Sequence, residues 1–226
     1  MTLLVLLGVP LFAAIALAFI GDRKLAPEIN IAGSAATFAA ALYLAMQVYD
    51  RGMIMAGGKF FFVDAFNVYL AVLTSFVSVT TAIFSRRYMR REREHGRVGS
   101  VRMRFYHAMY QLFIFAMLLC LLTNNIGVLW IAMELATLST VLLVSLYRTP
   151  TAIEAAWKYF ILCGVGIAQA LFGTVLLYFA AERVLGEGGE ALLWTNLNQV
   201  SGRLEPTVLS LAFVFLMVGY GTKVGL

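Results

Sequence analysis

The chain has 226 residues, of which 62% are hydrophobic and only 13% are charged, and its mean hydropathy is +0.86. Soluble domains are roughly half apolar and about one quarter charged, so this composition excludes an ordinary water-soluble protein. The net charge of +5 does not indicate nucleic-acid binding, because eight of the 17 basic residues fall in one short connection, residues 86–104. Such clustering is typical of a cytoplasmic loop in a membrane protein.

Seven apolar segments are long enough to span a membrane, which takes about 20 residues in a helix. The predicted helices are residues 2–20, 29–49, 61–84, 106–122, 126–147, 153–181 and 207–226. The first has no basic flank before it and no small-residue cleavage site, so we interpret it as a retained helix and not as a signal peptide. We therefore predict an all-α, polytopic membrane protein with a single transmembrane domain over residues 1–226. Because the apolar character continues to Leu226, we expect the sequence to be the N-terminal part of a longer one.

The distribution of basic residues predicts the orientation in the membrane. If the connection 86–104 is cytoplasmic, the connections on that side hold twelve Lys and Arg residues and the opposite side holds four. The four are Arg51, Lys59, Arg183 and Arg203. Because cytoplasmic connections carry the excess of Lys and Arg, this asymmetry predicts an outer N-terminus. The same basic connection is also open to a second interpretation, as a docking surface for a cytoplasmic partner or for anionic lipid.

Glu134 lies inside the otherwise uncharged segment 126–147, eight residues from its start. This places it about 12 Å below the outer surface, where a carboxylate costs several kcal/mol unless it has a partner, water or a proton. Thr137 lies one turn further along the same helix face, within reach of a hydrogen bond. A structural hydrogen bond is one interpretation of Glu134. We favour a proton-carrying role, because intramembrane ionisable residues are commonly functional.

Lys223 is a second charged residue in an apolar segment, near the end of residues 207–226. Counting from the segment's start places it about 24 Å deep, about 12 Å deeper than Glu134, so a shared water-filled cavity is as consistent as a direct ion pair. Snorkelling to the cytoplasmic interface is the simpler interpretation of a lysine near a helix end. The nearby Gly219, Gly221 and Gly225 favour instead an unwound or broken helix, as transporters use near their sites.

Lys158 lies near the start of segment 153–181 and follows Glu154 by four residues, a spacing that permits an ion pair along a helix. Taken alone, it is best interpreted as a snorkelling lysine at the interface. Aromatic residues flank it in the sequence AAWKYF, and Tyr159 among them is interpreted as an anchoring or packing residue.

The remaining polar residues are assigned structural roles. Asp64 is expected to be an interfacial cap, and His95 and His107 to be solvated or interfacial. Cys120 and Cys163 both lie in apolar segments and are interpreted as buried, reduced thiols. The sequence has no Cys/His spacing typical of a metal site and no glycine-rich phosphate loop, so no metal or cofactor is expected.

Three stretches carry a resemblance to a known family: TNNIGVLWIAMELATLST, EAAWKYFILCGVGIAQALFGTVLLY and LAFVFLMVGYGTKVGL. They resemble the antiporter-like membrane subunits shared by respiratory complex I, Mrp-type sodium/proton antiporters and membrane-bound hydrogenases. Within that superfamily the likeness is greatest to hydrogenase-4 component F. The resemblance covers essentially the whole chain and is weakest over residues 1–59. It implies the N-terminal portion of an antiporter-like fold of about fourteen helices, with two inverted five-helix repeats.

The resemblance also implies roles for three residues. Glu134 matches the acid of the family's fifth helix, and Lys223 matches the lysine of its seventh, broken helix. In the family these two form a coupled pair that changes the protonation of the lysine during pumping. Lys158 matches a basic position in the sixth helix that is often assigned to the proton path. Family members continue after the GTK-GL motif into further helices, so a complete proton path is not expected from this chain alone.

Together these features predict a proton-translocating, non-redox membrane subunit of a multisubunit oxidoreductase, of the hydrogenase-4, formate hydrogenlyase or complex I type, in a bacterial inner membrane. The expected partners are other membrane subunits, a peripheral hydrogenase or dehydrogenase arm and the lipid bilayer, with no nucleic acid. Three alternatives stay open: an Mrp-type sodium/proton antiporter subunit, a membrane subunit that couples proton flow to inorganic carbon uptake, and a non-transporting scaffold. The motifs do not separate these functions.

Overall fold

Long helices make up most of the chain. The computed structural model describes residues 2–186 and 188–225. The long helices are α1 (Thr2–Ile20), α2 (Ala26–Arg51), α3 (Ala65–Glu94), α4 (Ser100–Leu122), α5 (Ile126–Val144), α6 (Pro150–Leu185) and α8 (Pro206–Val224). All seven are long and apolar enough to cross a membrane, α5 when counted with the 3-10 turn Ser145–Tyr147 that follows it. The predicted all-α membrane fold is therefore confirmed.

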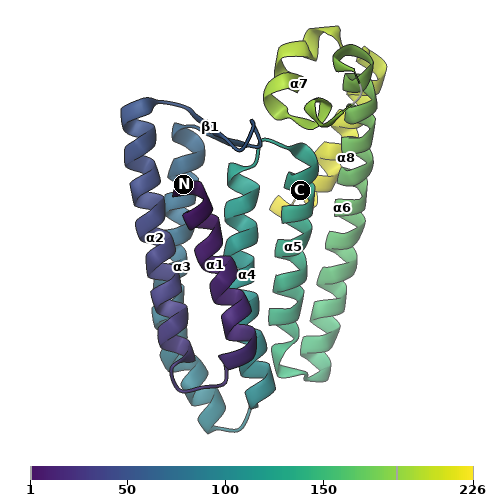
Figure 1. Ribbon diagram of the computed structural model, residues 1–226. Coiled ribbons are helices and arrows are strands. Elements are labelled where there is room, and N and C mark those ends of the chain that lie inside the picture. Colours follow the sequence, from purple (N-terminus) through teal and green to yellow (C-terminus); the bar gives the residue numbers. More distant parts are fainter. Residues whose placement is uncertain (1, 187, 226) are drawn as a thin grey trace.

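The helices lie side by side in two connected groups (Figure 1). In the first group α1 packs against α2 and α4, and α3 packs against α2 and α4. In the second, α6 packs against α5 and, most extensively, against α8. The α4–α5 contact joins the two groups. The short helix α7 (Trp194–Val200) lies in the connection between α6 and α8, beyond the end of the bundle (Figure 1).

The third helix begins later than predicted, because residues 61–63 form a strand. Phe61–Val63 pairs antiparallel with Ile54–Ala56 in a small hairpin, with Ile54 opposite Val63. Aromatic and β-branched residues favour strands as well as membrane helices, so hydropathy alone does not distinguish the two. The helix starts only after Asp64, whose carboxylate accepts a hydrogen bond from the Asn67 backbone N–H at 2.8 Å. Asp64 is thus the N-cap of α3, as predicted.

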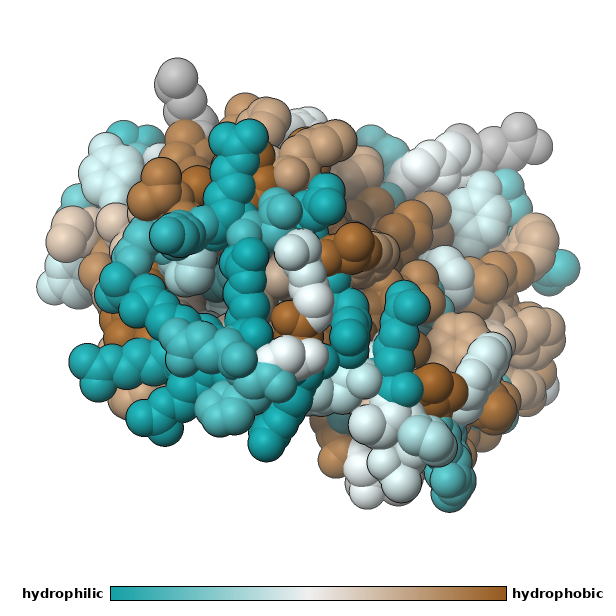
Figure 2. Space-filling model, turned by 90° about the horizontal axis from the view of Figure 1, so that it is seen from below, coloured by the Kyte–Doolittle hydropathy of each residue, from teal (hydrophilic) through white to brown (hydrophobic). Residues whose placement is uncertain are grey.

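The basic connection 86–104 is mostly helical, which corrects the prediction of a loop. Helix α3 continues to Glu94 and α4 starts at Ser100, so only five residues turn the chain. Charged residues such as Arg and Glu are good helix formers, so the helices extend past the point where the apolar segments end. Viewed from this end, hydrophilic side chains gather over the α1–α4 group, with apolar side chains at the rim (Figure 2).

The first group has a polar centre that includes His107, which was expected to be solvated or interfacial. The His107 side chain is instead buried, at 1% exposure. One turn further along α4, Gln111 donates hydrogen bonds from Nε2 to the Asn30 Oδ1 at 2.8 Å and to the Ser34 hydroxyl at 3.0 Å, both on α2. The expectation was wrong because it used only the proximity of His107 to the basic segment. In the structure the helix face that carries Gln111 turns inward, and it carries His107 with it.

Helix α6 is longer than the membrane requires, and this determines where α8 lies. Its 36 residues span about 54 Å at 1.5 Å per residue. α8 packs antiparallel along the part of α6 nearer to α7 (Figure 1). It therefore ends alongside α5 and α6 and does not reach the end of the bundle that holds the α5–α6 turn (Figure 1).

Candidate functional site

Helix α5 places Glu134 in the interior of the second helix group. The helix is started by Asn125, whose side-chain oxygen accepts hydrogen bonds from the backbone N–H groups of Gly127 and Val128, at 2.9 and 3.1 Å. Nine residues after Asn125, the Oε2 atom of Glu134 is buried and has no hydrogen-bond partner among the described residues. A buried oxygen of this kind calls for a proton, a water molecule or a nearby cation.

The Lys223 side chain crosses from α8 to α5. Its ammonium group donates a hydrogen bond to the Thr137 hydroxyl. The Thr137 side chain is 3% exposed, and its own hydroxyl donates to the Met133 carbonyl at 2.8 Å. Lys223 itself is half-buried. Its amine thus points into the protein, to a position one helical turn from Glu134.

This geometry corrects the predicted depth of Lys223. A position about 12 Å deeper than Glu134 followed from counting residues on the assumption that both helices enter the membrane at the same level. In the structure α8 starts beyond the bundle, next to the extended end of α6, so Lys223 comes down only to the level of Thr137. Among the described residues, the ion pairs include neither Glu134 nor Lys223, so the two charges lie near each other without a direct salt bridge.

Close packing between α6 and α8 holds Lys223 at this level. A Cβ atom added at Gly219 would lie 2.5 Å from the Ala170 nitrogen and 2.7 Å from the Gly166 carbonyl oxygen. Small residues allow the backbones of two membrane helices to approach in this way. Gly219 was expected to permit a broken helix, but α8 is continuous to Val224. The glycine serves interhelical packing instead.

A row of hydroxyl groups continues along α5 beyond Thr137. The Thr140 hydroxyl lies 3.0 Å from the Tyr159 hydroxyl of α6, and it also contacts the Thr137 carbonyl at 2.8 Å. Sequence reasoning assigned Tyr159 to packing or anchoring and did not consider Thr140. The spacing of Glu134, Thr137 and Thr140 by three residues places all of them on neighbouring positions of one helix face, which is the signal that was available.

Lys158 lies apart from this group. Its side chain is 72% exposed and forms the predicted i,i+4 ion pair with Glu154, at 2.5 Å. Lys158 lies near the start of α6, next to Tyr159 in the sequence. The structure therefore brings Lys223 close to the Glu134 turn of α5 but does not bring Lys158 to them.

The connections around α7 fix the second helix group at its other end. The Asn124 side chain donates to the Lys59 carbonyl and to the Thr195 hydroxyl, both at 2.9 Å, and so ties the hairpin to α7. Glu205 caps α8 by accepting hydrogen bonds from the Val208 and Thr207 backbone N–H groups, at 2.6 and 3.1 Å. These hydrogen bonds, the Val208 one first, hold the pKa of the Glu205 carboxyl below its ordinary value.

The described residues contain no group of three or more His, Cys, Asp or Glu side chains that could hold a metal ion. The site itself contains a lysine, a carboxylate and hydroxyl groups inside an apolar helix group. Such groups exchange protons and respond to each other's charge.

Comparison with protein families relates this chain to respiratory membrane subunits. Residues 123–226 match the family described as "NADH:quinone oxidoreductase/Mrp antiporter, TM". A hydrogenase-4 component F homolog of Methylacidiphilum infernorum is 44% identical over 217 residues, which is 96% of this chain and 44% of that one. NADH-quinone oxidoreductase subunit N of Herminiimonas arsenicoxydans is 28% identical over 85% of this chain and 37% of its own. The chain thus spans less than half the length of these relatives.

Solved structures share the fold. A chain of an archaeal membrane-bound sulfane sulfur reductase aligns with a TM-score of 0.79 at 22% identity, over 96% of this chain and 43% of its own. A chain of respiratory complex I from Thermus thermophilus, solved with bound Aureothin, aligns with a TM-score of 0.69 at 21% identity, over the same 96% and 43%.

Proposed function

Because this chain belongs to the superfamily of antiporter-like membrane subunits of complex I, Mrp antiporters and membrane-bound hydrogenases, we propose that it forms part of a proton-translocating subunit of a multisubunit oxidoreductase. The observation that carries the proposal is the Lys223–Thr137 hydrogen bond, one helical turn from the buried, unpartnered Oε2 of Glu134. A lysine and a carboxylate on neighbouring levels inside apolar helices are ionisable groups of the kind that commonly carry protons in membrane proteins.

In this proposal Lys223 carries the proton and Glu134 tunes its affinity. While Glu134 is ionised, its negative charge favours the protonated lysine; neutralisation of Glu134 lowers that preference and releases the proton. The hydroxyl groups of Thr137, Thr140 and Tyr159 lie in a row that leads from Lys223 toward the start of α6. Lys158, which is exposed beside Tyr159, would occupy the outermost position of this path.

The complex that we favour is of the hydrogenase-4 or formate hydrogenlyase type, because the relative with 44% identity is a hydrogenase-4 component F homolog. Its partners would be other membrane subunits and a peripheral hydrogenase arm that carries the redox chemistry. An Mrp-type sodium/proton antiporter subunit is the second candidate, because the matched family description includes the Mrp antiporter.

We further propose a bacterial plasma-membrane location with the N-terminus outside. The turns between α1 and α2, α3 and α4, and α5 and α6 share one end of the bundle, and that end carries the basic clusters (Figures 1 and 2). An excess of Lys and Arg marks the cytoplasmic side of membrane proteins.

The test is Glu134→Gln in the full-length subunit assembled with its partners. Glutamine keeps the size and hydrogen-bonding groups of glutamate but does not ionise. We expect substrate-driven proton uptake into inverted vesicles to fall by most of its wild-type value, with the amount of assembled complex unchanged. Asp50→Asn removes an exposed carboxylate near the end of α2, outside the proposed path, and serves as the matched control. Wild-type pumping by the Glu134→Gln variant would contradict the proposal.

A further inference from the structure

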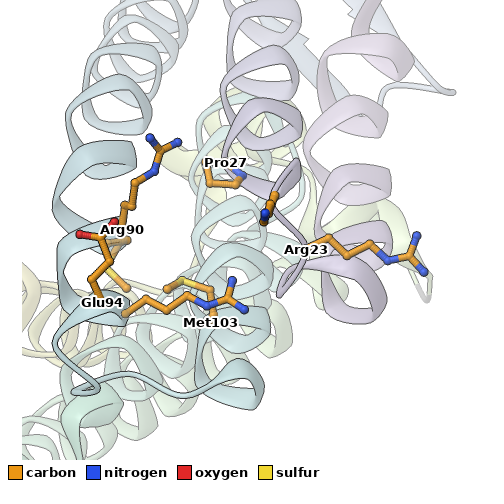
Figure 3. A pocket seen from close by; sticks show the side chains of 8 residues that line it. Arg23, Pro27, Arg90, Glu94 and Met103 are labelled. Atoms are coloured by element: carbon orange, nitrogen blue, oxygen red, sulfur yellow. The ribbon is translucent and has the colours of Figure 1, made fainter.

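A hollow of about 590 Å³ opens at the basic end of the first helix group. It lies between the α1–α2 turn, the last turns of α3 and the first turn of α4 (Figure 3). Four cations line it: Arg23 and Lys24 from the turn and Arg90 and Arg93 from α3. Figure 3 shows Arg90 and Arg23 on opposite sides of the hollow, with the Arg23 side chain extending away from it. The volume falls within the range of sites that hold small organic groups.

The charge of this hollow is not compensated by its surroundings. Glu94 is the only acid among its lining residues. The nearby acids Asp22 and Glu28 already form ion pairs, with Arg104 at 3.6 Å and with Arg86. Among the described residues no ion pair includes Arg23, Lys24, Arg90 or Arg93. The hollow therefore presents an excess of positive charge to whatever occupies it.

One of the four cations is held in place. Arg93 donates from Nη1 to the Asp22 carbonyl at 2.7 Å, which connects the end of α3 to the α1–α2 turn. This contact uses a carbonyl and leaves the positive charge of the guanidinium available. This hydrogen-bonded arginine lies at the edge of the hollow and holds the end of α3 against the α1–α2 turn. The hollow is thus a defined feature of the packing between these segments.

The floor of the hollow is apolar. The Met89 and Met103 side chains line it and are 3% and 5% exposed, and Pro27 lies beside them. Phe19 near the end of α1 and Leu25 in the α1–α2 turn, close in sequence to Arg23 and Lys24, add apolar side chains that are 75% and 67% exposed. A cationic rim, an apolar floor and an adjacent apolar wall match the order of groups in a phospholipid, from phosphate through glycerol to acyl chain.

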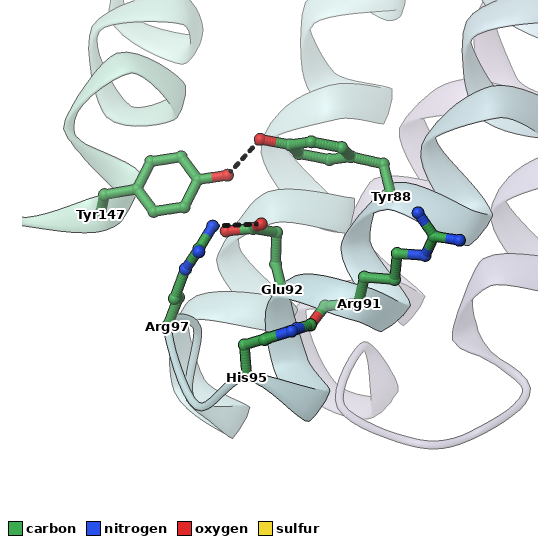
Figure 4. A network of polar contacts seen from close by, with 6 residues as sticks. All are labelled: Tyr88, Arg91, Glu92, His95, Arg97 and Tyr147. Atoms are coloured by element: carbon green, nitrogen blue, oxygen red, sulfur yellow. Dashed lines mark hydrogen bonds and ion pairs between the residues drawn. The ribbon is translucent and has the colours of Figure 1, made fainter.

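The other basic residues of this end are arranged differently. Arg97 is paired with the buried Glu92 carboxylate at 3.0 Å, below the Tyr88–Tyr147 hydroxyl contact of 2.9 Å (Figure 4). Arg91 points away from this network (Figure 4). Arg97 thus stabilises the α3–α4 turn and Arg91 faces solvent. The basic residues that line the hollow therefore form a separate group from the other basic residues of this end.

We propose that this hollow binds the phosphate headgroup of an anionic phospholipid, with the glycerol against Met89 and Met103 and the acyl chains along α1. Basic pockets between membrane helices at the headgroup level are suited to such lipids. A soluble anion would not use the apolar floor and wall. An acidic protein segment would be expected to contact the exposed, outward-pointing Arg91 as well. The inference is independent of the proposed proton path.

The experiment measures lipid binding to the full-length subunit purified in a neutral detergent, by native mass spectrometry with phosphatidylglycerol or phosphatidylcholine. The test variant is Lys24→Gln/Arg90→Gln. The matched control, Arg91→Gln/Arg148→Gln, removes two exposed cations from the same end outside the hollow. We expect phosphatidylglycerol to bind the wild type and the control alike, and the test variant roughly thirty-fold more weakly, because each basic residue contributes on the order of a few-fold to tenfold in affinity.

Lys24→Arg/Arg90→Lys keeps the charge and should keep the binding, which separates loss of charge from misfolding. Equal binding of phosphatidylcholine and phosphatidylglycerol would overturn the proposal. So would an equal loss of affinity in the test and control variants. Displacement of phosphatidylglycerol by millimolar inorganic phosphate would identify a free-anion site instead. Unchanged lipid binding combined with loss of a copurifying partner from the test variant would identify a protein-docking surface.

Discussion

The ammonium group of Lys223 donates a hydrogen bond to the hydroxyl of Thr137 and so connects the end of α8 to the middle of α5. This contact places the lysine beside the helix turn that carries Glu134. It also depends on the level at which α8 packs against α6.

The Lys223–Thr137 contact is tested by Thr137→Val, which keeps the shape of the side chain and removes its hydroxyl. Hydrogen bonds to charged groups contribute about 1.5–3 kcal/mol. Because Lys223 is half-buried, we expect the lower end, so the free energy of unfolding in detergent should fall by about 1.5 kcal/mol, and proton pumping should fall with it. Thr137→Ser retains the hydroxyl and should behave like the wild type. Equal behaviour of the Val and Ser variants would show that Lys223 does not depend on this contact.

The packing of α6 against α8 is tested by Gly219→Ala. The added Cβ would lie 2.5–2.7 Å from atoms of Ala170 and Gly166, so the helices must move apart. Overpacking of this kind costs about 1–3 kcal/mol. We expect a lower unfolding temperature in detergent and weaker proton pumping, since Lys223 moves with α8. Gly164→Ala is the control, because a Cβ there meets no atom of the described residues within 4 Å. A Gly219→Ala variant as stable as the control would refute the packing argument.

The Glu205 cap gives the start of α8 a defined pH dependence. The hydrogen bonds from Val208 and Thr207 lower the pKa of Glu205 in the folded protein relative to the unfolded one. Its stabilising contribution is therefore present above the ordinary carboxyl pKa and is lost as the pH falls through the lower, folded-state pKa. We expect Glu205→Ala to speed hydrogen exchange of the Thr207 and Val208 amides at neutral pH. The difference from the wild type should shrink below roughly pH 4.

The matched control for the cap is Asp50→Ala, which removes an exposed acid near the end of α2. It should leave exchange at the start of α8 unchanged at every pH. If the Glu205→Ala difference persists undiminished in acid, the ionised carboxylate is not the capping group.

Hydropathy and charge predicted most of the fold, because a membrane helix must bury its own backbone polar groups and expose apolar side chains. The bounds of α1, residues 2–20, agree with the apolar segment. The errors lie where hydropathy carries no information. Residues 61–63 are apolar but pair with Ile54–Ala56 as a strand, and α3 continues through a charged segment to Glu94 because Arg and Glu favour helices.

Glu134 and Lys223 were selected as candidates because a charge in an apolar segment is conspicuous in the sequence. Their relative position was not predictable from residue counts. It depends on the level at which α8 packs against α6. That level is determined by the close tertiary packing of three small residues, Gly166, Ala170 and Gly219. Thr140 and Tyr159 were missed because uncharged hydroxyl groups are common in membrane helices, and only the α5–α6 contact brings these two together.

The proposed orientation is tested by cysteine labelling in intact cells with a membrane-impermeant maleimide. Ser100→Cys lies exposed at the start of α4 and Ser201→Cys lies exposed in the connection after α7, at opposite ends of the bundle. We expect Ser201→Cys to react in intact cells and Ser100→Cys only after the cells are opened. Cys120 and Cys163 lie within membrane helices and should give little background. The reverse pattern would invert the orientation.

The role of Lys223 as a proton carrier is tested by Lys223→Arg. A guanidinium group keeps a positive charge and hydrogen-bond donors but does not release its proton at any working pH. If Lys223 only anchors α8 to Thr137, arginine should replace it with little loss. If Lys223 exchanges protons, the Arg variant should assemble normally and lose most proton pumping in vesicles. Oxidoreductase turnover that continues in the absence of pumping would show that the change uncouples the two activities. Normal pumping by the Arg variant, with normal assembly, would reduce Lys223 to a structural contact, and the proposed path would then have to run through Glu134 alone.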